Sequence, residues 1–229
     1  MKKKAICIIP ARSGSKRIPF KNIKRINGKP MITHVIENLK KSKCFENIFV
    51  STDSKKIKLI AEKNGAKVPF LRKKNLSNDK TPVIEVIKDT IKKISANYQF
   101  DTICYIYPTA IFVKKNYIIK MQKLFKRSKA DHFMVVKEFN HPIDRALYIK
   151  NKKIFPVNSN KFIYGTQKFK TYYYDTGQIY FSKKKSIEKG KKLFQSRVKC
   201  YVEKNDIIDI DNYDDLIKAK KKIQYEKKK

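Results

Sequence analysis

The chain has no long hydrophobic run, and this absence excludes a membrane-spanning helix. No stretch of eighteen apolar residues occurs among its 229 residues, whereas a helix that crosses a bilayer needs about twenty. The basic N-terminus is followed by a short apolar run at residues 5–9, which Pro10 ends. That run is too short for the core of a signal peptide. We therefore predict a cytoplasmic protein.

Cysteines are few and widely separated. They stand at positions 7, 44, 104 and 200, with no C-x-x-C pair and no neighbouring histidine. This spacing argues against both a zinc motif and a disulfide framework. Cys7 and Cys104 lie in apolar, strand-like runs, so we expect both to be buried, reduced thiols.

Acidic residues are scarce, with 20 Asp and Glu against 56 Lys and Arg, for a formal net charge of +36. Such an excess can indicate nucleic-acid binding. However, only seven of the basic residues are Arg, the lysines are spread along the whole chain, and Lys, Ile, Asn, Tyr and Phe share AT-rich codons. We interpret the lysines as solvated helix faces and predict no nucleic-acid partner, with a basic nucleic-acid-binding protein as the rival hypothesis. The charge should still attract anionic ligands.

The sequence does contain enough apolar residues for a core, 41% of the chain. Short apolar runs predict strands at 4–9, 47–52, 67–71, 102–107, 171–181 and 198–202. Helical spacing predicts helices at 30–43, 55–64, 83–94, 116–126 and 213–223. This alternation argues for an α/β fold with a mostly parallel sheet and helices on both faces. We predict one domain over residues 1–225, with an irregular insert at 139–171 and a basic tail at 226–229.

The strongest functional signal follows the first predicted strand. Residues 8–22 read IIPARSGSKRIPFKN, and ligands of open α/β sheets bind at the carboxyl ends of strands. Small side chains at Ser13, Gly14 and Ser15 would let backbone N–H groups approach a phosphate. The segment matches neither G-x-x-x-x-G-K-[ST] nor G-x-G-x-x-G. It holds four cations in ten residues: Arg12, Lys16, Arg17 and Lys21.

These cations could be a solvated basic turn, or they could bind a triphosphate and the charged transition state of nucleotidyl transfer. Three of the seven arginines fall within fourteen residues, at Arg12, Arg17 and Arg25. In a chain that otherwise uses Lys, clustered Arg indicates a need for its two-pronged hydrogen-bonding geometry. The segment therefore favours phosphate binding.

A second signal is a group of acidic residues near the C-terminal end. Five of the 20 acidic residues fall in residues 206–215, DIIDIDNYDD. Asp209 and Asp211 are two apart, a spacing that places both carboxylates on one face at a strand end. Two convergent carboxylates suit Mg²⁺ shared with substrate phosphates. Alternatively, Asp211 is simply the N-cap of the last helix, and spacing alone favours neither interpretation.

The segment at residues 8–22 resembles the signature of the cytidylyltransferases that activate sialic-type sugars, as do NGKPM at 27–31, VSTD at 50–53, LR at 71–72 and the loop around Asp79. The resemblance runs from residue 8 to about residue 219. It implies a Rossmann-like nucleotidyltransferase fold with a dimerisation insert, a homodimer, CTP as the nucleotide, and Mg²⁺ on Asp209 and Asp211. Arg12, Lys16 and Lys21 would act with those aspartates in catalysis. The predicted nucleotide-binding residues are Ala11, Arg12, Ser13, Gly14, Ser15, Lys16, Lys21, Asn22, Arg72, Asp79 and Thr81.

Two further segments bear on the second substrate. HPIDRAL at 141–147 and YYDTGQIY at 173–180 look most like the pseudaminic acid cytidylyltransferases, although Tyr174 and Thr176 stand where those enzymes usually have His and Ala. The resemblance implies transfer of CMP from CTP to the anomeric hydroxyl of a nine-carbon acidic sugar, best pseudaminic acid, with release of pyrophosphate. N-acetylneuraminate, legionaminate or a related sugar acid is the alternative. The predicted sugar-binding residues are Tyr107, Thr109, Arg145, Gln167, Asp175 and Gln178, with Arg145 suited to the sugar carboxylate.

Overall fold

The structure is a computed structural model of the whole chain and describes residues 4–163, 165, 167, 169–190 and 193–228. Within these residues a central sheet has the strand order β10-β6-β9-β5-β1-β4. The strands are β1 (Ala5–Pro10), β4 (Asn47–Ser51), β5 (Thr102–Ile106), β6 (His132–Glu138), β9 (Tyr173–Lys183) and β10 (Val198–Val202). β1 runs parallel to β4 and β5, and β10 runs parallel to β6, whereas β9 is antiparallel to both of its neighbours. The predicted α/β fold is confirmed, with a mixed, mostly parallel sheet.

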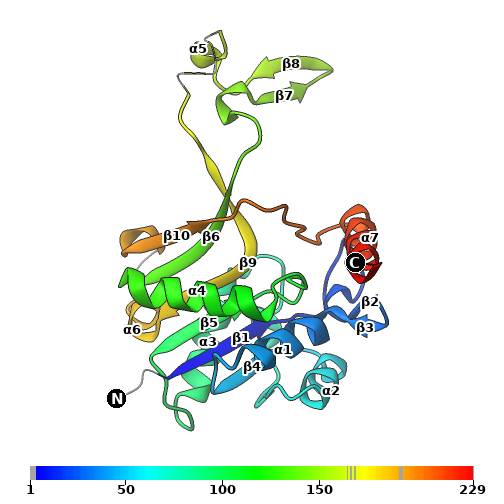
Figure 1. Cartoon of the computed structure of the whole chain (residues 1–229), viewed down its shortest axis with the longest axis vertical. Helices are drawn as coiled ribbons and strands as arrows, with labels where there is room; N and C mark the ends of the chain where they lie inside the picture. The colour runs from blue at the N-terminus through cyan, green and yellow to red at the C-terminus, as the bar shows by residue number, and fades with distance from the viewer. Residues whose placement is uncertain (1–3, 164, 166, 168, 191–192, 229) are drawn as a thin grey trace.

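Helices cover both faces of the sheet, as the alternation predicted (Figure 1). Successive residues of β1 show why: Cys7 and Ile9 face one apolar cluster, and Ile6 and Ile8 face the other. The first cluster packs against α1 (Met31–Ser42), α2 (Lys55–Lys63), α4 (Lys115–Ser128) and α7 (Tyr213–Lys228). The second packs against α3 (Val83–Ile94) and α6 (Lys184–Glu188). None of the described helices is both long and apolar enough to cross a membrane.

Most predicted elements appear within two residues of their expected bounds, and the exceptions have physical causes. In place of the strand expected at 67–71 there are two isolated bridges. Lys67 pairs with Phe49 in β4, and Leu71 pairs with Thr52, just after β4. Pro69 lies between them and has no N–H to continue a ladder. Strand β6 was not predicted at all. The basic tail expected at 226–229 is helical through Lys228, because α7 continues that far, and Lys229 lies outside the described residues.

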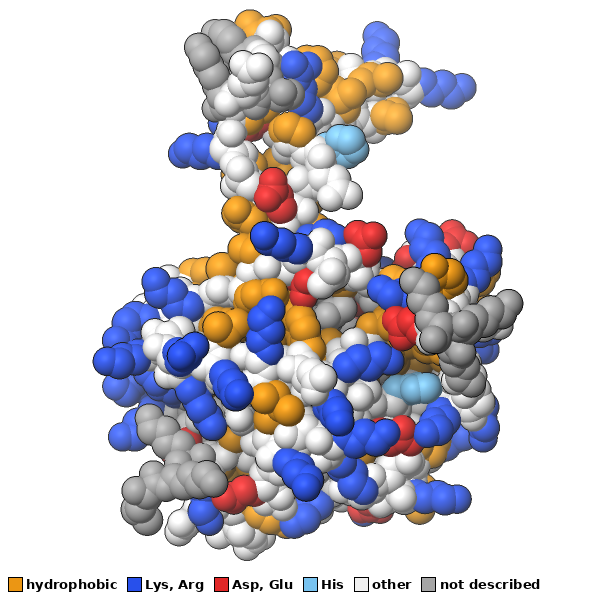
Figure 2. Space-filling model, viewed as in Figure 1, with side chains coloured by type: hydrophobic (Ala, Val, Ile, Leu, Met, Phe, Trp, Pro, Cys, Tyr) orange, Lys and Arg blue, Asp and Glu red, His pale blue; other side chains and the backbone are white. Residues whose placement is uncertain are grey.

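The insert expected at 139–171 projects from the globule at the end of the long β6 and β9 strands (Figure 1). It contains the hairpin β7 (Leu147–Lys150) and β8 (Lys153–Pro156) and the short helix α5 (Ser159–Phe162). Its apolar side chains are strongly exposed, with Ile149 at 74% and Ile154 at 65%. Figure 2 shows orange apolar side chains on this projection beside several blue basic ones, and blue side chains are also scattered over the rest of the visible face.

The antiparallel direction of β9 matters for the site. Parallel strands β1, β4 and β5 end at one edge of the sheet, and β9 begins at that same edge. The N–H of Tyr107, just after β5, donates to the carbonyl of Gln178 in β9 at 3.0 Å. Residues 175–178 are thereby placed beside the loops that follow β1 and β5.

Candidate active site

A cavity of about 710 Å³ opens at this edge of the sheet. It lies at the carboxyl ends of β1 and β5, the expected ligand position for an open α/β sheet. Most of the predicted site residues line it together, although they come from segments far apart in the chain: Arg12, Ser15, Lys16, Lys21, Asn22, Arg72, Asp79, Thr81, Tyr107, Thr109, Asp175, Asp209 and Asp211.

Other predicted site residues lie outside the cavity lining. Ala11 is fully buried, and its N–H donates to the carbonyl of Ser51 at 2.9 Å, which ties the loop to β4. Gln178 is buried within β9, and Ser13 and Gly14 lie in the loop behind the lining residues. Arg145 and Gln167 belong to the projecting insert, where the Arg145 guanidinium lies over the Phe162 ring at 5.1 Å. Substrate contacts stay predictions, both for these six residues and for those that line the cavity.

The loop after β1 is held in shape by two contacts that fix its backbone. Both the N–H and the hydroxyl of Ser13 donate to the carboxylate of Asp53, at 2.8 and 2.7 Å. The amide nitrogen of Asn22 donates to the carbonyl of Arg12 at 2.8 Å. Asp53 was not among the predicted site residues, although it closes the VSTD segment that carried the family resemblance. Asp53 therefore supports the loop after β1.

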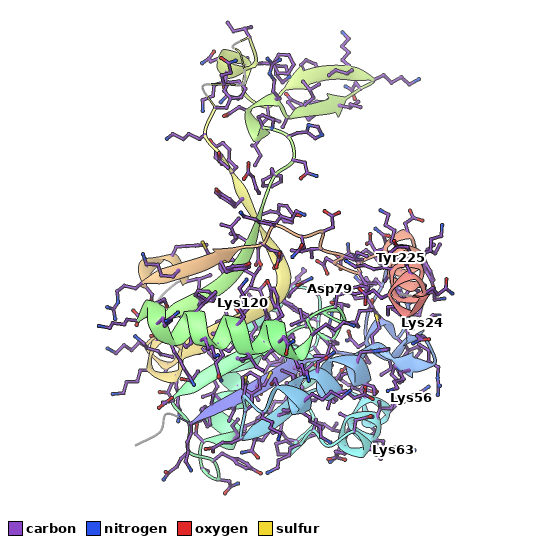
Figure 3. All side chains as sticks on the ribbon, viewed as in Figure 1. Lys24, Lys56, Lys63, Asp79, Lys120 and Tyr225 are labelled. Carbon is purple, nitrogen blue, oxygen red and sulfur yellow. The ribbon has the colours of Figure 1, made fainter. Side chains whose placement is uncertain are left out.

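Asp79 closes one side of the cavity. Its carboxylate forms ion pairs with Arg12 and with Lys16, the second at 2.7 Å. The hydrogen bonds from Lys16 and Arg12 lower the pKa of Asp79, which keeps the carboxylate ionised. Figure 3 shows Asp79 at the upper edge of the sheet, on the side toward α7. A carboxylate therefore lies where these two cations could otherwise hold phosphate oxygens.

Arg72 also lines the cavity and is only 6% exposed. Its N–H donates to the carbonyl of Thr52 at 2.7 Å, and its Nη2 donates to that of Ser51 at 3.2 Å. Burial lowers the pKa of the guanidinium. Its buried Nε atom has no hydrogen-bond partner within the described part of the chain, so one donor of the guanidinium is unused.

The two aspartates near the C-terminal end both reach the cavity, but in different states. Asp211 is held by Lys21 at 2.9 Å on one oxygen and by Arg17 at 2.9 Å on the other. Burial would raise the pKa of Asp211, but the hydrogen bonds and charges of those two cations outweigh it and lower the pKa. Arg17 thus joins the site as a residue that the predicted set omitted.

Asp209 is the less compensated of the pair. Within the described residues, no hydrogen bond or ion pair reaches its carboxylate, and burial together with the neighbouring Asp211 raises its pKa to about 6. Asp209 is exposed in the cavity lining, and a carboxylate short of a cation there fits a metal ion. In the described part of the chain, His, Cys, Asp and Glu side chains form no group of three or more that could hold a metal ion. An Mg²⁺ ion bound here would therefore take its other ligands from phosphates and water.

The hydrogen bonds at the start of α7 show that Asp211 is not its N-cap. The side chain of Asn212 accepts from the N–H of Asp215 at 3.0 Å, and the Asp215 carboxylate accepts from the N–H of Asn212 at 3.1 Å. This reciprocal pair is a capping box with Asn212 as the cap. The capping interpretation of Asp211 is therefore wrong.

Tyr107, just after β5, and Tyr180, in β9, form an aromatic wall of the cavity. The Tyr180 hydroxyl donates to Asp175 at 2.7 Å, and the Gly177 N–H donates to the same oxygen at 3.1 Å. Tyr107 meets the Tyr180 ring edge-on at 6.1 Å between centroids. Burial and the charge of Asp175 raise the pKa of Tyr107 to about 12, so it stays a neutral donor. Tyr180 and Gly177 line the cavity and were missed, although both lie in the YYDTGQIY segment.

Comparisons with known proteins agree with this geometry. The model of the cytidylyltransferase family matches residues 6–229. A pseudaminic acid cytidylyltransferase of Campylobacter jejuni is 36% identical over 220 residues, which cover 95% of each chain. An N-acylneuraminate cytidylyltransferase of Streptococcus agalactiae is 34% identical over 219 residues, which are 93% of this chain and 52% of that protein.

The same fold occurs in a solved structure of CMP:2-keto-3-deoxy-manno-octonic acid synthetase complexed with CTP, with a TM-score of 0.72 at 16% identity. The match covers 97% of this chain and 99% of that one. Nucleotidyltransferases of this kind are generally metal-dependent. The family match spans nearly the whole chain and includes every residue that lines the cavity. The chain therefore belongs to the cytidylyltransferase family and is a CTP-dependent enzyme of that family.

Proposed function

We propose that this enzyme transfers CMP from CTP to the anomeric hydroxyl of a nine-carbon acidic sugar, with pseudaminic acid as the preferred substrate. The observation that carries the proposal is the convergence in one cavity of four phosphate-loop cations, two aspartates and an aromatic wall. The similarity to a pseudaminic acid cytidylyltransferase over 95% of the chain supports the choice of sugar. N-acetylneuraminic, legionaminic and related sugar acids are the alternatives.

In the proposed reaction the anomeric oxygen of the sugar attacks the α-phosphorus of CTP. A new bond forms between that oxygen and phosphorus, the bond to the β-phosphate oxygen breaks, and pyrophosphate leaves while the hydroxyl loses its proton. Arg12, Lys16 and Lys21 neutralise the charge of the triphosphate and of the departing pyrophosphate. Asp79 must release Arg12 and Lys16 for this, because a carboxylate and a phosphate compete for the same donors.

Asp209 and Asp211 are the residues that would hold Mg²⁺ in this reaction. Both line the cavity, and the Asp209 carboxylate has a raised pKa that a cation would offset. When bound, the ion polarises phosphate oxygens and aligns them for displacement. Lys21 offsets part of the negative charge of the pair, since its Nζ donates hydrogen bonds to the Asp211 carboxylate and to the carbonyl of Ile210.

The most direct test measures pyrophosphate release from CTP with a panel of nonulosonic acids. We expect kcat/KM for pseudaminic acid to exceed that for N-acetylneuraminic acid roughly tenfold or more. The two sugars differ at C7 and C9, where one has an N-acyl group and a methyl and the other has hydroxyls. Tyr107 and Tyr180 suit the less polar groups, and each hydroxyl buried without a partner costs about 1–3 kcal/mol. Equal or better turnover of N-acetylneuraminic acid would refute the assignment of the sugar and leave the enzyme class intact.

We further propose that the insert joins two copies of the chain, because it exposes several large apolar side chains, among them Leu147, Ile149, Ile154, Val157 and Ile163, and clustered exposed apolar side chains mark protein interfaces. Light scattering should report a mass near twice 27.0 kDa. Ile149→Asp, on β7, should shift the mass toward that of one chain. Leu59→Asp is the matched control, because Leu59 on α2 is 68% exposed, close to the 74% of Ile149. A wild-type monomer with full activity would remove the proposed role of the insert.

A further inference from the structure

Gly177 lies in the cavity wall in direct contact with one of the proposed metal ligands. Its backbone has a φ of +62°, in the left-handed region. A Cβ atom at this position would lie 2.9 Å from Oδ2 of Asp209 and 3.5 Å from its Cγ. That spacing is shorter than van der Waals contact, so one of the two groups would have to move. Gly65 has a similarly close neighbour, but it is the flexible end of Lys40, which can move at little cost.

The backbone at Gly177 is held on both sides. The Thr176 hydroxyl, only 2% exposed, donates to the carbonyl of Val135 at 3.0 Å. The N–H of Gly177 donates to Asp175 at 3.1 Å, and the next carbonyl, that of Gln178, accepts from Tyr107. Opposite this segment the pairing of β6 with β9 is irregular, between Met134 and Val136, so the strand is held here by the hydrogen bonds just named and not by a regular ladder. These contacts leave the strand little freedom to withdraw from Asp209.

The segment that carries Asp209 is also anchored close by. Ile210, the next residue, is fully buried, and its carbonyl accepts from Lys21 at 3.0 Å. Asp211 is held in turn by Lys21 and Arg17. Since both backbones are fixed, a methyl group at position 177 would be relieved by rotation of the Asp209 carboxylate.

We propose that Gly177 is a positioning residue, whose lack of a side chain leaves the space in which the Asp209 carboxylate lies beside Asp211 and faces the triphosphate. The inference rests on the proposed metal role of that pair. Mg²⁺ demands near-ideal octahedral geometry, so a rotated ligand is costly even when no ligand has been removed. Glycine is then needed at position 177 for two reasons: its backbone conformation, and the space that the Asp209 carboxylate occupies.

The test is Gly177→Ala, read out by calorimetric titration of Mg²⁺ into the protein saturated with CTP, without sugar so that no turnover occurs. We expect binding of Mg²⁺ to weaken about tenfold or more, comparable to one lost second-sphere contact of a metal ligand. Gly190→Ala is the matched control, because Gly190 has a φ of +67° and a Cβ added there would meet no atom of the described residues within 4 Å. It carries the same backbone strain and should bind Mg²⁺ as the wild type does.

Asp209→Ala separates this inference from the function on which it rests. In that background the carboxylate is gone, so Gly177→Ala should cause no further loss of Mg²⁺ binding. If Gly177→Ala is too unstable to purify, the double variant should fold again, because the close contact is removed. Unchanged Mg²⁺ binding in Gly177→Ala, a further loss in the double variant, or failure of the double variant to regain folding would each overturn the inference. Wild-type binding by Asp209→Ala itself would instead defeat the metal proposal.

Discussion

Replacing Asp211 by alanine is expected to lower kcat/KM for CTP by about 10²–10³-fold, the range found when one preorganised electrostatic group is removed from an active site. The substitution removes two functions of the carboxylate. It is a proposed Mg²⁺ ligand, and it also holds Lys21 and Arg17 in place at 2.9 Å each. Asp209→Ala should act in the same direction, because the two aspartates are proposed to hold the same ion.

Thermal stability should change little in Asp211→Ala, because Asn212 and Asp215 cap the following helix. Asn212→Ala supplies the matched comparison one residue away. It should cost about 1 kcal/mol of folding free energy, lower the melting temperature by about 2–4 °C and leave turnover nearly intact. Steady-state kinetics and thermal melts of both variants decide the matter. If Asp211→Ala were the less stable and the more active of the two, the carboxylate would have no role in catalysis.

Lys21→Met should reduce kcat/KM by about 10²-fold or more, with most of the loss in kcat. Lys21, together with Arg17, links the loop after β1 to the segment that carries Asp211. Its side chain is only 17% exposed, and its Nζ bonds both the Ile210 carbonyl and the Asp211 carboxylate. Methionine keeps most of the side-chain length and removes the charge, so the loss would measure stabilisation of the phosphates and of the metal-binding segment.

Lys63→Met is the control for this change. Lys63 is exposed in the last turn of α2, and Figure 3 shows it at the lower side of the molecule, away from Asp79. The control removes the same charge from a protein that carries +36, so it separates a local effect from a general weakening of attraction for anions. Equal losses in the two variants would show that Lys21 acts through overall charge alone.

Comparison of particular elements shows which features local sequence could predict. The helix at Val83–Ile94 and the strand at Val198–Val202 have the predicted bounds, because hydrophobic periodicity is a local signal. The loop after β1 was located from its small residues and clustered arginines, which record local requirements of backbone approach and charge. The direction of β9 was not predictable, since a two-residue alternation is the same in both directions. That direction places Asp175 and Gly177 at the site.

The sequence by itself determined the α/β class and located the loop after β1 and the two aspartates that line the cavity, because each is specified by residues close together in the chain. The tertiary structure decided how these parts meet. Ser13 donates a hydrogen bond to Asp53, forty residues away. Arg12 and Lys16 form ion pairs with Asp79, and Gly177 lies next to Asp209, where a side chain would not fit. It also decided between two local alternatives, since Asn212 caps the last helix and leaves Asp211 to the cavity. These contacts depend on which groups the folded backbone brings within hydrogen-bonding distance. The spacing of residues along the chain does not specify which groups those are.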